Sequence, residues 1–102
     1  MNEPATIKPL RPEWGDKGVM AWRVTTENLA AVAEWTRGDV VRKGSGCEGV
    51  EFLVRGQTMN CGGFEEPLYD CAFPGDWVVL DSDTVFEAYW DHCFRNTYVV
   101  DE

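Results

Sequence analysis

The segment CAFPGDWVVLDSD, residues 71–83, determines how the second half of the chain is expected to fold. Pro74-Gly75 fits the two central positions of a type II turn, because proline presets φ and glycine supplies a positive φ. Asp76 can accept hydrogen bonds from the free amides of that turn. Residues 77–90 then predict a hairpin, in which two apolar strands flank the polar turn DSD at 81–83. A turn and two strands therefore account for the whole segment without a catalytic role.

A strand and a helix are predicted upstream. VMAWRVTT, residues 19–26, alternates in a way that predicts a half-buried strand. The next stretch predicts a helix over 27–37, which a threonine at 25 or 26 caps and Gly38 ends in the left-handed conformation. Four of its residues follow the i, i+3, i+4, i+7 spacing of one helical face: Leu29, Val32, Ala33 and Thr36.

The middle of the chain predicts a series of short strands. VEFLV at 50–54 is expected to turn at Arg55-Gly56 and to return as QTMNC at 57–61. Gly62-Gly63 then breaks the chain before the next strand. Pro67 in that strand indicates that Glu65 and Glu66 lie in a loop or on an edge.

These elements define the expected architecture. DHCFRNTYVV near the C-terminus predicts a short helical turn, which places Phe94 and Tyr98 on one face. We therefore expect an α+β fold with a small, mostly antiparallel sheet of about five to six strands. The helix at 27–37 should pack on that sheet. Residues 1–18, which are rich in proline, should form an extended arm, and 19–102 a single compact domain.

Charge is distributed unevenly along the chain. Residues 1–55 hold eight acidic and eight basic groups, whereas residues 56–102, here called the acidic half, hold ten acidic groups and one base, Arg95. Nucleic-acid binders show the opposite sign, so direct nucleic-acid binding and attachment to an anionic membrane are not expected. The excess predicts either a basic partner or a face that keeps the protein dispersed. The chain lacks an apolar stretch of about 18 residues and an apolar signal segment, so we expect a cytoplasmic location.

Residues suited to catalysis or metal binding are few. His92 is the single histidine, and the neighbouring Cys93 would point to the opposite side of a strand. No hydrolase, zinc-protease or phosphate-loop motif is present. No enzyme activity and no cofactor are therefore expected. A small enzyme that uses a cysteine with His92, or clustered carboxylates, is the third alternative.

The cysteines do not show the spacing of a metal site. They are separated by 14, 10 and 22 residues, without a closely spaced pair typical of zinc ribbons: Cys47, Cys61, Cys71 and Cys93. Reduced thiols that fill the core are the main expectation. A metal site assembled from distant loops and a disulfide stay open.

Three motifs together resemble a class of small proteins encoded by bacteriophages and prophages. They are ENLAAVAEW followed by glycine, then PGDWVV, then FEAYWDHCFRNTY, and they cover about residues 19–100. The matching positions are Asn28, Leu29, Val32, Trp35, Pro74, Gly75, Asp76, Trp77, Val78, Val79, Phe94 and Tyr98. The chain departs from the class in a longer middle and in the acidic turn at 81–83. The resemblance transfers no catalytic residue and implies a phage accessory protein in the cytoplasm of a bacterial host.

We therefore predict a non-enzymatic acidic protein that binds a basic surface of a host protein and modulates or inhibits it. A defence factor or a nucleic-acid-handling factor would be such a host protein. The expected partner-binding residues are Glu65, Glu66, Asp70, Asp81, Asp83, Glu87, Asp91 and Trp90. The alternative is a sponge for a small nucleotide signal, in which Trp22, Trp77, Trp90 or Tyr89 stacks on the base. Homo-oligomerisation stays open.

Overall fold

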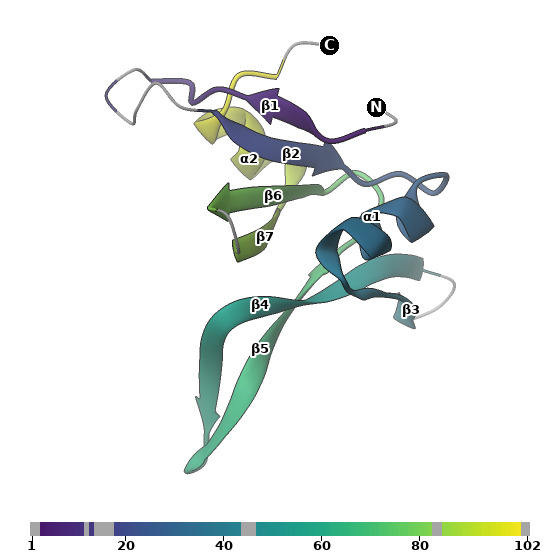
Figure 1. The fold of residues 1–102 in the computed structure, drawn as a ribbon, viewed down its shortest axis with the longest axis vertical. Coiled ribbons are helices and arrows are strands. Elements are labelled where there is room, and N and C mark those ends of the chain that lie inside the picture. Colours follow the sequence, from purple (N-terminus) through teal and green to yellow (C-terminus); the bar gives the residue numbers. More distant parts are fainter. Residues whose placement is uncertain (1–2, 12, 14–17, 44–46, 83–84, 101–102) are drawn as a thin grey trace.

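The computed structural model describes residues 3–11, 13, 18–43, 47–82 and 85–100, without the side chains of 43, 47, 54–61, 64, 81–82 and 85. Its elements are β1 (Ala5–Ile7), β2 (Val19–Arg23), α1 (Leu29–Thr36), β3 (Asp39–Lys43), β4 (Cys47–Cys61), β5 (Phe64–Ala72), β6 (Trp77–Ser82), β7 (Val85–Tyr89) and α2 (Asp91–Thr97). Figure 1 shows a four-stranded sheet in the order β1-β2-β6-β7 and a three-stranded sheet in the order β3-β4-β5. The predicted α+β class, with one main helix and a short C-terminal helix, is confirmed. The described strands divide between two antiparallel sheets, which the sequence did not reveal.

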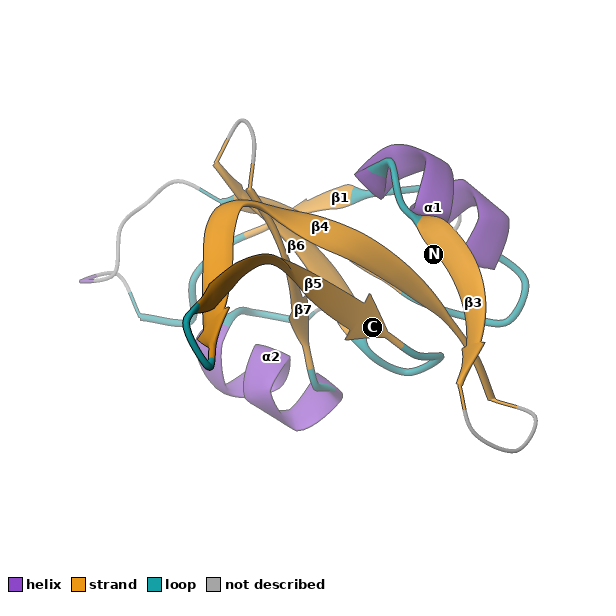
Figure 2. Cartoon of the chain, turned by 90° about the horizontal axis from the view of Figure 1, so that it is seen from below, coloured by secondary structure: helices purple, strands orange, loops and turns teal. Residues whose placement is uncertain are grey.

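The four-stranded sheet has a hydrophobic core on each face. One face carries Trp22 and Val78, which pack with α1 and with the inner side of the three-stranded sheet. The other face carries Ala21, Trp77 and Val79, which pack with α2 and the segment after it. Figure 2 shows the two helices on opposite sides of the strands. The strand predicted to be half-buried is therefore buried on both faces, because α2 covers its second side.

The start of α1 is tied to the end of β2 by one buried asparagine. The side-chain oxygen of Asn28 accepts a hydrogen bond from the Thr25 N–H at 2.7 Å, and its amide nitrogen donates to the Arg23 carbonyl at 2.8 Å. Asn28 precedes the helix, so the predicted threonine cap is wrong. Asn28 instead closes the turn that carries the chain from strand to helix.

The end of α1 also differs from the prediction. Arg37, and not Gly38, adopts the left-handed conformation, with φ of 58°. Gly38 N–H donates to the Ala33 carbonyl at 2.9 Å. A β-carbon on Gly38 would collide with the backbone carbonyl of Glu51 in β4. Glycine is needed here because α1 passes into β3 against the backbone of the next strand.

The hairpin of β4 and β5 projects from the rest of the molecule (Figure 1). β4 is one strand of 15 residues, so the turn predicted at Arg55-Gly56 is wrong. Its pairing with β5 shifts register between Leu53 and Thr58, and this irregularity spans the predicted turn. The chain reverses at Gly62 and Gly63, whose φ values are 60° and 94°. Two positive φ angles suit a two-residue hairpin turn, so the predicted break at these glycines is confirmed.

The turn at Pro74-Gly75 forms as the sequence predicts. Gly75 has φ of 100°, and the Asp76 N–H donates to the Phe73 carbonyl at 2.8 Å. The Asp76 carboxylate in return accepts a hydrogen bond from the Phe73 N–H at 3.0 Å. Val24 is bonded on both sides of this turn, to the Gly75 N–H and to the Asp76 carbonyl, each at 2.8 Å. These bonds hold the turn against the end of β2.

The N-terminal segment lies beside the C-terminal one. β1 pairs antiparallel with β2, and Pro9 forms a bridge with Tyr98. The Leu10 N–H donates to the Thr97 carbonyl at 2.8 Å, and the Val99 N–H donates to the Lys8 carbonyl at 2.9 Å. Part of the expected arm at 1–18 is thus an edge strand of the sheet. Within the described ranges, no helix has the length and apolar character needed to cross a membrane.

The close approach at Gly38 leads to a stability prediction. Gly38→Ala should lower the free energy of unfolding by about 1–3 kcal/mol, because the added methyl group forces α1 away from β4. Urea unfolding followed by tryptophan fluorescence measures the change. Ala30→Gly, on the exposed side of α1, is the control and should cost about 1 kcal/mol or less. An unfolding free energy unchanged in Gly38→Ala would contradict the packing.

Candidate functional site

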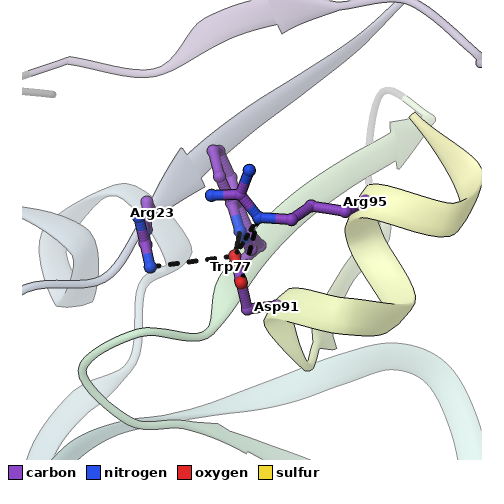
Figure 3. A network of polar contacts seen from close by, with 4 residues as sticks. All are labelled: Arg23, Trp77, Asp91 and Arg95. Atoms are coloured by element: carbon purple, nitrogen blue, oxygen red, sulfur yellow. Dashed lines mark hydrogen bonds and ion pairs between the residues drawn. The ribbon is translucent and has the colours of Figure 1, made fainter. Parts of the chain in front are cut away.

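Asp91 is the centre of a polar network between the four-stranded sheet and α2 (Figure 3). Its Oδ1 accepts a hydrogen bond from the Trp77 indole Nε1 at 2.9 Å. Both of its oxygens lie 3.0 Å from the Nε of Arg95, one turn further along α2. The Nη2 of Arg23, at the end of β2, lies 3.8 Å from Oδ1. One carboxylate thus connects two strands and a helix.

The network lowers the pKa of Asp91. The hydrogen bond from Trp77, together with the guanidinium groups of Arg95 and Arg23, holds the pKa of Asp91 below its ordinary value, against an opposing effect of desolvation. A lowered pKa means that the ionised carboxylate stabilises the fold. Asp91, predicted to bind a partner, therefore already has cationic contacts within the chain.

Asp70 also has an internal role. Its Oδ2 accepts a hydrogen bond from the Ala88 N–H of β7 at 2.9 Å, and its Oδ1 accepts one from the Cys71 N–H at 3.0 Å. Ala88 lies on the edge of the four-stranded sheet, so Asp70 links β5 to that edge. Backbone N–H and C=O groups that stay unpaired on an edge strand can pair with another chain. The Asp70 carboxylate satisfies one such group, the Ala88 N–H.

The other predicted acidic residues lie apart from one another. Glu65 and Glu66 are exposed beside the turn of the β4–β5 hairpin, which Figure 1 shows well away from α2. Glu87 in β7 is half-buried and accepts a hydrogen bond from the Tyr89 hydroxyl at 3.3 Å. Burial, followed by the charges of Tyr98 and Glu87, raises the pKa of Tyr89 well above its ordinary value.

The acidic turn after β6 is only partly described. Asp81 lies within β6, but its side chain lies outside the described part, as does Asp83 entirely. Trp90, the remaining predicted contact residue, has 66% of its surface exposed at the start of α2. Its ring centroid lies 5.6 Å from that of His92.

The sequence analysis missed a pair of exposed apolar residues on the three-stranded sheet. Leu53 of β4 and Tyr69 of β5 are directly opposite each other and are 43% and 56% exposed. Val50 and Phe52 point to the opposite side, into the core. We call the outward side, with Glu51, Leu53, Tyr69 and Cys71, the outer face. The alternation along β5 was visible in the sequence, but it does not tell which side is covered.

A pocket of about 590 Å³ lies where β2 ends. Arg23 and Trp77 line it, together with Ile7 of β1, Val100 after α2 and the turn at 74–75. Trp77 is one of the stacking residues predicted for the nucleotide alternative. The Trp77 ring is stacked on Phe94, with centroids 4.2 Å apart, and is 1% exposed, which leaves little of its surface for a base.

The cysteines that the structure describes do not fill the core. Cys93 is exposed on α2, and Cys71 is partly exposed on the outer face, so the expected core role is wrong for these two. The side chains of Cys47 and Cys61 lie outside the described part. Over the described ranges, His, Cys, Asp and Glu side chains form no group of three that could hold a metal ion.

Comparison with known proteins gives no relative: no family model, curated protein or solved structure matches the chain significantly. The resemblance to small phage proteins therefore rests on the three motifs of the sequence and stays a prediction.

The lowered pKa of Asp91 leads to a pH prediction. Asp91→Asn should be less stable than the parent at neutral pH, because the amide cannot pair with two guanidinium groups. The stability that the ionised Asp91 provides is present above its unfolded pKa and is lost as pH falls through its lower folded pKa. The difference in melting temperature between parent and variant should therefore shrink below about pH 4.

Glu34→Gln, on the exposed side of α1, is the control and should show no such pH-dependent difference. Thermal unfolding followed by circular dichroism between about pH 3 and 7 measures both variants. A difference for Asp91→Asn that stays constant over this range would contradict an ionised carboxylate at the centre of the network.

Proposed function

We propose that this protein is a non-enzymatic binding protein that engages a basic surface of another protein through the outer face and the hairpin beside it. The observation that carries the proposal is the exposed pair Leu53 and Tyr69, which lies in neither core cluster. A tyrosine exposed on a rigid sheet is typical of residues that contribute strongly to protein interfaces.

The charge around this pair supports a basic partner. Glu65 and Glu66 lie further along β5 from Tyr69, towards the turn of the hairpin, and both are exposed. Glu51 of β4 lies opposite Cys71 on the outer face. The acidic half has one base against ten acidic groups. A basic partner would therefore meet an apolar centre with carboxylates around it, and electrostatic attraction would accelerate association.

The internal contacts narrow the set of predicted contact residues. Asp70 and Asp91 accept hydrogen bonds that connect the sheets and α2. Their replacement would damage the fold, and the outcome would not report on a partner. Glu65 and Glu66 are exposed on the hairpin and are free of this difficulty, so they stay the predicted contact residues of this surface, whereas Trp90 is exposed at the start of α2, outside it. The resemblance to phage accessory proteins would place the partner in a bacterial cytoplasm.

The apolar centre is tested by the double variant Leu53→Ser/Tyr69→Ser. Its stability should change little, because both side chains are exposed, while its capture of basic proteins from a bacterial lysate should be lost. Quantitative mass spectrometry of material retained on the immobilised parent and variant measures the loss. Leu10→Ser removes an equally exposed apolar side chain elsewhere and should leave capture unchanged. Equal capture by the double variant and the parent would contradict the proposed contact surface.

The acidic rim is tested with the captured partner in purified form. Glu65→Lys/Glu66→Lys should slow association at about 50 mM salt, and the difference from the parent should nearly vanish at about 500 mM, where charges are screened. Surface plasmon resonance measures the association rates. Glu3→Lys/Glu34→Lys makes the same change of charge in residues 1–55, outside the acidic half, and should slow association less. A rate independent of salt, or an equal effect of both variants, would contradict steering by the hairpin carboxylates.

A further inference from the structure

The pocket at the end of β2 has a chemical character different from that of the outer face. Its volume of about 590 Å³ lies within the range of small-molecule sites, roughly 300–1,000 Å³. Its apolar lining comes from separate parts of the chain: Ile7 of β1, Val24 after β2, Pro74 of the turn, Trp77 of β6 and Val100 after α2. A small apolar body would therefore contact side chains from both ends of the chain at once.

Arg23 is the cationic group in the pocket lining. Its guanidinium carbon lies 5.9 Å from the centre of the Trp77 ring, and its Nη2 lies 3.8 Å from Asp91. Asp91 is held more closely by Arg95, at 3.0 Å, and by Trp77, at 2.9 Å. A guanidinium carries its N–H donors in a planar fork that matches a carboxylate, and the Arg23 side chain is 35% exposed, so a ligand in the pocket can reach it.

Glu27 is the carboxylate in the same lining, and its interactions are local. A hydrogen bond from its own backbone N–H, followed by those from the hydroxyls of Thr26 and Thr25, lowers the pKa of Glu27. The Glu27 carboxylate is thus engaged by the turn before α1. Its negative charge in the same lining opposes a phosphate ester with two negative charges more than a ligand with one.

We propose that this pocket binds a small organic carboxylate with an apolar body. The carboxylate would pair with the Arg23 guanidinium, and the apolar body would lie against Ile7, Pro74 and Val100. This assignment does not depend on the proposed protein-binding function, because the pocket lining and the outer face share no residue.

The test uses three probes and the full chain. 2-Naphthoate has an apolar body and one negative charge, 2-naphthalenemethanol has the same body without the charge, and acetate has the charge without the body. Titrations followed by ¹H–¹⁵N NMR should show naphthoate shifting the backbone amide of Val100 and the indole N–H of Trp77. Both other probes should bind at least about tenfold more weakly, which corresponds to the loss of one charge-assisted contact or of the apolar contacts.

Two variants separate the role of the Arg23 charge from the role of the pocket volume. Arg23→Met should weaken naphthoate about tenfold and leave naphthalenemethanol unchanged, whereas Arg42→Met, on β3, should change neither. Val100→Trp should block both aromatic probes, because it fills the pocket without altering Arg23. Val100→Trp also serves if Arg23→Met fails to fold.

Three outcomes would overturn the proposal. The first is the absence of shifts at millimolar naphthoate. The second is equal binding of naphthoate and naphthalenemethanol, which would leave no role for Arg23. The third is tighter binding of adenosine monophosphate than of naphthoate, which would instead favour the nucleotide alternative. None of these outcomes affects the capture experiment on Leu53 and Tyr69, so the two proposals fail independently.

Discussion

The burial of the Trp77 ring is the interaction on which the arrangement of the molecule depends. The residue pairs with Arg23 on one neighbouring strand and with Tyr89 on the other, stacks on Phe94 of α2, and donates its indole N–H to Asp91. Removal of a buried tryptophan costs about 3–5 kcal/mol, a large part of the stability of a domain of this size. Trp77 therefore joins the sheet to α2 through both an apolar and a polar contact.

The turn before Trp77 determines where that ring lies. Hydrogen bonds on both sides of Gly75 hold the turn against Val24, so the first residue of β6 is aligned with the last residue of β2. The same alignment places Arg23 beside Trp77 and opens the pocket between the chain ends. The local chemistry of proline and glycine thus controls both a core contact and a concave surface.

The acidic half is divided between charges that support the fold and charges that face solvent. Asp70 and Asp91 accept hydrogen bonds from N–H groups of distant segments, and Asp76 accepts one within its own turn. Glu65 and Glu66 instead lie exposed near the end of the hairpin. An acidic composition is therefore a poor guide to a contact surface in this protein. The exposed apolar pair Leu53 and Tyr69 is more informative, because carboxylates at a surface are common whereas opposed apolar residues outside any core are not.

The sequence by itself determined the α+β class, the turn at Pro74-Gly75, the break at Gly62-Gly63 and the two helices, since each depends on local conformational preferences or short-range periodicity. Only the tertiary structure decided that the strands separate into two sheets and that β4 runs through Arg55-Gly56. It also decided that Gly38 avoids the backbone of Glu51, and that Asp91 pairs with two arginines. These features depend on which segments pack together across long separations in the chain. Periodicity shows which residues share one side of a strand. Whether that side is buried depends on elements that are distant in the chain. The pocket and the exposed outer face both follow from how those elements pack.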